Sequence, residues 1–192
     1  MECFENEKIE NLQYCDEAVE GVEYYDCKFY NCQFTNIKFR NCSFSDCEFF
    51  NCALRNVHFE FSQMKNSTFT DSLLMGISWN EIKAISLNSF PVKAFNNCSI
   101  KYNNFIESNL PSFDFSTSEI SDSLFQECLL MKANFKNVNF KDTSFTNCNL
   151  SFSDFRGADN YNIDINNNKL TRAKFSFPSV ICLLNSINIE IE

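Results

Sequence analysis

Cysteine is the residue type in this chain most able to do chemistry, but its spacing indicates packing. The chain has 192 residues and eleven Cys. Eight of them are spaced by five residues or by multiples of five from the others in the same half of the chain. This spacing differs from the two-residue gap of zinc-binding Cys pairs. They are Cys27, Cys32, Cys42, Cys47, Cys52, Cys98, Cys128 and Cys148. We therefore expect small inward-facing residues with free thiols, and we predict no metal site.

One histidine and the carboxylates are the remaining candidates for catalysis. His58 is the single His, so a Ser/His/Asp or Cys/His set would need it. It lies between Val57 and Phe59, which take inward positions in the pattern described below, so we expect His58 on the surface. A carboxylate pair for acid–base work needs a cleft, and the expected surface is convex. We therefore predict that the chain is not an enzyme and binds no cofactor.

The elements that carry these residues repeat every five residues. A large apolar residue stands at every fifth position from Tyr24 to Leu74, and again from Phe90 to Phe175 with Asn160 as the exception. The residue two places earlier is small or β-branched in most repeats, and neither position is charged. A helix would need spacings of three and four, and a strand would need alternation. Two inward residues in every five fit a coil that turns a corner once per repeat and stacks into a solenoid.

Short polar residues mark the predicted corners. In the first series, Asn or Asp precedes the small residue in nearly every repeat, from Asp26 to Asp71, and Phe61 is an exception. Asn and Asp side chains bond nearby backbone groups and suit a repeated turn. They explain how a chain with three Gly turns so often.

The pattern resembles the pentapeptide-repeat family, whose repeat centres on Leu or Phe with a small residue two places before it. The resemblance covers roughly residues 22–175. It implies an all-β solenoid, a right-handed quadrilateral β-helix with four repeats per coil. We expect one domain over 1–192, divided into an irregular N-terminal cap at 1–21, a first stack at 22–75, a break at 76–89, a second stack at 90–175, and a capping helix with a terminal strand at 176–192.

The break and the C-terminal tail are the irregular parts of the pattern. Leu74 and Phe90 are sixteen residues apart, three repeats plus one, so we expect a one-residue bulge or small loop near Gly76 and Trp79. An apolar run after Pro178 predicts a short helix that covers the open end of the coil. The alternation that follows predicts a terminal strand that pairs two copies into a homodimer. Its apolar residues are Ile187, Ile189 and Ile191.

Charge is concentrated at the N-terminus. The net charge is −9, and residues 1–26 hold nine acidic residues against Lys8, which leaves the rest of the chain nearly balanced. This disfavours nucleic acid as a direct ligand, because phosphate binding needs a basic surface. No apolar run is long enough for a membrane span and no signal peptide is evident, so with so many Cys we expect a cytoplasmic protein.

An acidic column is the candidate interaction site. With twenty residues per coil, Asp26 would stack over Asp46, and Glu107 and Glu127 would continue the column if the break keeps the faces aligned. The column is either a solvated corner or an imitation of a row of phosphates.

A narrower resemblance concerns the function. The break near Gly76, the segment Asp154–Asp159 and the Leu-Leu helix after it resemble the Qnr-type quinolone-resistance proteins. That resemblance implies a dimeric DNA mimic that binds bacterial DNA gyrase and topoisomerase IV and protects them from quinolones. The alternative is a generic protein–protein interaction scaffold with another partner.

Overall fold

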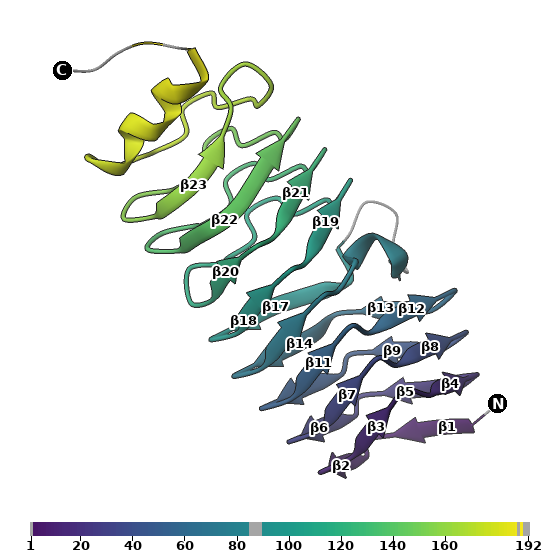
Figure 1. Ribbon diagram of the computed structural model, residues 1–192. Helices are drawn as coiled ribbons and strands as arrows, with labels where there is room; N and C mark the ends of the chain where they lie inside the picture. Colours follow the sequence, from purple (N-terminus) through teal and green to yellow (C-terminus); the bar gives the residue numbers. More distant parts are fainter. Residues whose placement is uncertain (1, 85–89, 188, 190–192) are drawn as a thin grey trace.

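The chain forms a rod in which four short strands make one coil. The computed structural model describes residues 2–84, 90–187 and 189, and the chain winds from one end of the rod to the other (Figure 1). One coil contains β5 (Val22–Tyr25), β6 (Lys28–Tyr30), β7 (Gln33–Thr35) and β8 (Lys38–Arg40), after which β9 (Ser43–Ser45) lies beside β5. About eight such coils stack, and every strand pair is parallel. The predicted four-sided solenoid is confirmed.

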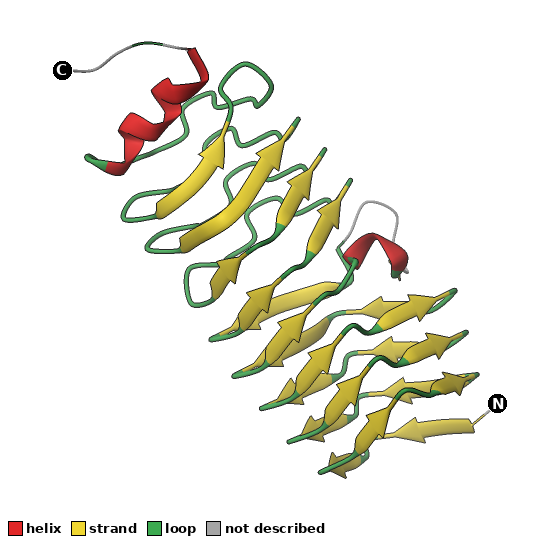
Figure 2. Ribbon diagram, in the orientation of Figure 1, coloured by secondary structure: helices red, strands yellow, loops and turns green. Residues whose placement is uncertain are grey.

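The strands of successive coils join into five parallel sheets along the rod (Figure 2). The first contains β1 (Glu2–Glu5), β5, β9, β13 (Gln63–Lys65) and β16 (Lys83–Ala84). The second contains β2 (Lys8–Glu10), β6, β10 (Glu48–Phe50), β14 (Ser67–Thr70) and β17 (Val92–Asn96). The third contains β3 (Gln13–Cys15), β7, β11 (Ala53–Arg55), β15 (Leu73–Met75), β18 (Ser99–Lys101) and β20 (Glu119–Ser121).

The last two sheets follow one another on the same side of the rod. The fourth contains β4 (Ala18–Glu20), β8 and β12 (His58–Glu60). The fifth contains β19 (Asn104–Ile106), β21 (Leu124–Gln126), β22 (Asn139–Thr146) and β23 (Asp159–Ile163). Elsewhere in the C-terminal half, single bridges such as Asn109 to Leu129 and Asp114 to Asn134 replace strands.

The residues at every fifth position fill the interior. Phe125 is fully buried, and its ring stacks on Phe105 at 4.5 Å and on Phe145 at 4.8 Å between ring centroids. Each stacking partner is twenty residues away, one coil above or below. Aromatic stacking adds to the burial of apolar area, so the ladder of rings holds each coil on the next.

The eight Cys of the repeat are buried beside this ladder. All eleven Cys are free thiols. The Cys128 thiol donates to the backbone carbonyl of Phe105 at 3.0 Å, a contact that recurs between other coils. Burial raises the pKa of Cys47 to about 12, so this thiol stays protonated and unreactive at neutral pH. Their predicted role as small core residues is confirmed.

The corners use the left-handed backbone region. Asp26 and Asn31 have φ of 51° and 55°, and residues at the same place in other repeats match them. Asn, Asp and Gly enter this region at the least cost, which explains their choice. The Asn51 side-chain amide donates to Asn31 Oδ1 at 2.7 Å, so corner side chains also link adjacent coils.

The N-terminal segment is a regular coil and not an irregular cap. Residues 2–20 form β1 to β4, and β1 pairs with β5 in register, Glu2 opposite Val22. The inward side chains Phe4, Ile9 and Tyr14 are only half-buried because they have a neighbouring coil on one side among the described residues.

The break lies later than Gly76 and Trp79, and it is larger than one residue. Leu54 pairs with Leu74, twenty residues on, whereas Leu74 pairs with Ile100, twenty-six residues on. Trp79 is 1% exposed and fills an ordinary inward position in the short 3-10 helix η1 (Trp79–Glu81). The six additional residues therefore fall after β16, in a stretch whose residues 85–89 lie outside the described ones.

The C-terminal helix is confirmed, and it reaches further than expected. The 3-10 helix η2 (Ser179–Ile187) follows Pro178, packs on β23 and buries Leu183. Ile187 ends this helix, so a strand does not begin there. Ile189 is exposed, whereas Ile191 lies outside the described residues. Neither described helix is long and apolar enough to cross a membrane.

Two of the corner glycines, Gly21 and Gly76, share a φ of 68° and provide a matched test of this corner geometry. An alanine at position 21 would meet no atom within 4 Å, so Gly21→Ala should cost roughly 1–2 kcal/mol for the left-handed backbone alone. At Gly76 the new methyl would clash with the Asn56 side chain. That amide donates to Asn36 Oδ1 at 3.1 Å, so Gly76→Ala should cost about 1 kcal/mol more. Urea unfolding measures both, and equal losses would contradict this account.

Candidate functional site

The outer faces of the rod must carry any function, because side chains fill the interior. Buried apolar residues run from Val22 in the second coil to Leu183 in the terminal helix. Outward side chains at equivalent repeat positions stand one coil apart, in rows along the rod. A partner would therefore meet a convex surface on which each side chain has a fixed place.

The structure does not bring the four acidic residues of the predicted column together. Asp26 and Asp46 follow β5 and β9 on one corner. The bridge between Ser78 and Asn104 places Glu107 and Glu127 on another corner, the one that holds Phe61. The alignment assumed across the break is wrong because the coil that contains the break has twenty-six residues instead of twenty.

The Asp26–Asp46 corner has the features of a solvated surface. Asn66 donates its side-chain amide to Asp46 Oδ1 at 3.0 Å, which continues the corner ladder. Beside it, Lys28 Nζ lies 3.4 Å from Glu48 Oε1 in the next coil. These neighbours spread positive charge and hydrogen-bond donors among the acids, so the corner is not a row of uncompensated negative charge.

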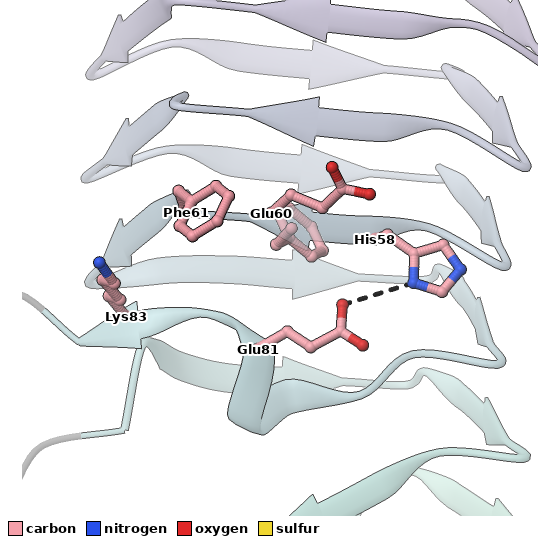
Figure 3. A pocket seen from close by; sticks show the side chains of 6 residues that line it. His58, Glu60, Phe61, Glu81 and Lys83 are labelled. Carbon is pink, nitrogen blue, oxygen red and sulfur yellow. Dashed lines mark ion pairs between the residues drawn. The ribbon is translucent and has the colours of Figure 1, made fainter.

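A groove opens where the fourth sheet stops. That sheet ends at β12, and the next coil places η1 where a strand would continue the ladder. The resulting hollow has a volume of about 580 Å³. Its lining residues are His58, Phe59, Glu60, Phe61, Glu81 and Lys83 (Figure 3). The groove is therefore a direct product of the interrupted sheet.

His58 and Glu81 form an ion pair across one end of this groove. His58 Nδ1 lies 3.4 Å from Glu81 Oε2 (Figure 3). An acid–base pair of this kind needs a nucleophile or bound water and a desolvated site to do chemistry. No Ser, Thr or Cys lines the groove, and the two side chains are 48% and 35% exposed. The pair joins two coils and offers no catalytic set.

Phe61 and Lys83 form the other end of the groove. Phe61 has a φ of 55° and is 73% exposed, and Lys83 Nζ lies 5.9 Å from the centroid of its ring. The sequence did signal this position, because Phe61 interrupts the run of Asn and Asp corners. The groove itself could not be read from the pattern, because it depends on η1 replacing a strand.

Glu60 is held by two cations of the preceding coil. Arg40 Nε donates to Glu60 Oε2 at 2.7 Å, and Lys38 Nζ lies 3.6 Å from Oε1. The hydrogen bond from Arg40 holds the pKa of Glu60 below its usual range. The Glu60 carboxylate is thus fully engaged within the rod. Among the described residues, no group of three or more His, Cys, Asp or Glu is placed to hold a metal ion.

Comparisons with known proteins agree on the fold. Residues 27–71 and 123–159 match the family model described as Pentapeptide repeats, in eight copies. A search of curated proteins found no match.

Two solved structures show the likeness in three dimensions. A trypsin-treated variant of QnrB1, described as a plasmid-mediated fluoroquinolone resistance protein, is 18% identical with a TM-score of 0.52, over 100% of this chain and 98% of that one. HetL of the cyanobacterium Nostoc sp. strain PCC 7120, a pentapeptide repeat protein involved in heterocyst differentiation regulation, is 12% identical with a TM-score of 0.55, over 89% and 86%. At such identities the likeness concerns the fold alone. The chain therefore carries pentapeptide repeats, matched over residues 27–71 and 123–159, and has the fold of solved pentapeptide-repeat proteins.

Proposed function

We propose that this chain is a non-enzymatic protein-binding scaffold. The observation that carries the proposal is the filled interior, which leaves only the outer rows of side chains for contact. Ring stacking and corner ladders fix these rows, so a partner would bind a surface that loses little conformational freedom. HetL and QnrB1, described by regulatory and resistance roles, share this architecture.

Bacterial DNA gyrase or topoisomerase IV is the partner we propose first. Two observations support it. The fold likeness to QnrB1 spans the whole chain, and the first coil carries most of the net negative charge. Its acidic side chains, among them Glu5, Glu10 and Glu20, are exposed. A protein surface that binds DNA is positively charged, and such a coil would complement it.

The test combines gyrase supercoiling, with and without ciprofloxacin, with affinity capture by the immobilised full-length chain. We expect the wild-type chain to restore supercoiling in the presence of the drug and to capture gyrase. Replacing Glu5, Glu10 and Glu20 together with Gln should weaken both effects at least tenfold and make them less sensitive to salt. Replacing Glu107 and Glu127 with Gln should change them less than twofold, because these two residues lie several coils away from the first coil.

The possible outcomes test the topoisomerase partner and the scaffold function separately. Capture of another protein, without any effect on gyrase, would leave the scaffold standing and remove the topoisomerase. If the chain captures no protein from lysates of several bacteria and leaves supercoiling unchanged, the scaffold proposal itself fails.

We also propose that two copies associate through the C-terminal end. Exposed apolar side chains gather there: Phe177 precedes η2, Ile181 lies within it, and Ile187 and Ile189 lie at its end. Covering such residues is favourable, and a two-fold axis would allow each copy to cover the other.

Light scattering on a chain that ends at Ser186 tests this association. The shortened chain keeps the bond from the Asn166 amide to the Ser186 carbonyl, so η2 should stay folded. We expect the full chain to have twice the monomer mass and the shortened chain to be monomeric. The double variant Ile187→Ser, Ile189→Ser should also be monomeric, whereas a shortened chain that stays dimeric would exclude this interface.

A further inference from the structure

We propose that the groove between Phe61 and His58 binds an acidic segment of a partner protein, with an apolar side chain of that segment placed on the Phe61 ring. This inference rests on the scaffold function and names the chemistry of one contact. The groove comprises the six residues given above for Figure 3. Neither the acidic corner nor the C-terminal end contributes to it.

Phe61 is the first reason. The equivalent corners of the two preceding coils are Gly21 and Asn41, at φ of 68° and 51°, residues that tolerate the left-handed region. A bulky Phe pays a conformational cost there. Its ring is 73% exposed, so burial within the rod does not offset this cost. A strained, exposed aromatic ring beside a groove is a contact surface that the fold itself does not use.

The charge around the groove is the second reason, and it points to an acidic partner. Both Glu60 oxygens are engaged by Arg40 and Lys38, at 2.7 and 3.6 Å. Lys83 Nζ has no ion-pair partner among the described residues and lies over the Phe61 ring. Lys83 is thus the cation of the groove that the rod leaves without a carboxylate, and a carboxylate of a partner can pair with it.

The shape of the groove determines how such a segment would lie. Lys83 and Phe61 stand at one end, and the ion pair of His58 and Glu81 stands at the other (Figure 3). A carboxylate of the partner would pair with Lys83 while its apolar neighbour covers the open side of the Phe61 ring. A volume of about 580 Å³ is within the range of small-ligand pockets and admits one aromatic side chain with its flanking backbone.

Fluorescence anisotropy with the full-length chain and a labelled, end-blocked DEFED pentapeptide tests the proposal. We expect measurable binding that weakens at least tenfold in Phe61→Asn and at least fivefold in Lys83→Glu. A DEAED peptide, which lacks the ring, should bind at least tenfold more weakly than DEFED. A KKFKK peptide, which keeps the ring and reverses the charge, should show no saturable binding.

Phe152→Asn is the matched control. Phe152 is another corner residue, with a φ of 63° and 41% exposure, and Arg172 Cζ lies 6.0 Å from its ring centroid. It lines none of the described pockets. Asn suits the left-handed region, so both Asn variants should melt no lower than the wild type. Only Phe61→Asn should lose the peptide.

Three results would overturn the proposal: no saturable binding of DEFED to the wild type, equal binding to Phe61→Asn, or equal losses in Phe61→Asn and Phe152→Asn. None of these results bears on the proposed scaffold function, which the capture experiment tests separately.

Discussion

The stacking of each coil on the next is the interaction on which the structure depends. Each strand forms hydrogen bonds with the strands of the coils directly above and below it. The number of residues in a coil must therefore be fixed if the inward rings of neighbouring coils are to stack. Twenty residues satisfy this condition, as the contacts of Phe105, Phe125 and Phe145 show. The corner ladders follow from the same length, because Asn51 reaches Asn31 only when the two are one coil apart.

The same constraint explains where the outer surface becomes irregular. The coil that contains the break has twenty-six residues, and at that level β12 loses its neighbouring strand to η1. Trp79 compensates on the inside, where its indole N–H donates to Asn103 Oδ1 at 3.0 Å. On the outside the interruption leaves a groove. The interior thus stays continuous through Trp79, while the interrupted fourth sheet leaves a hollow on the surface.

Features that repeat could be predicted from the sequence, because each depends on a local rule applied many times. The buried ladder that includes Phe29, the inward Cys27 and the left-handed corner at Asn31 all follow from position within five residues. The helix after Pro178 also followed from local signals.

Features that depend on coil length could not be predicted. Phe90 resumes the apolar series sixteen residues after Leu74, a spacing that predicts one extra residue in the coil. The pairing of Leu74 with Ile100 shows six extra residues. Because of these extra residues, Glu107 lies on a different corner from Asp26. The pairing of His58 with Glu81, twenty-three residues apart, depends on η1 and so was also out of reach.

The unfolding free energy of Phe125→Ala tests most directly whether the interior ladder holds the rod together. Phe125 is fully buried between two stacked rings, so its truncation should cost about 3–5 kcal/mol. Phe177→Ala, at a ring that is 80% exposed, should change stability by about 0.5 kcal/mol or less. A cost below about 1 kcal/mol at Phe125, or equal costs at the two positions, would contradict the account.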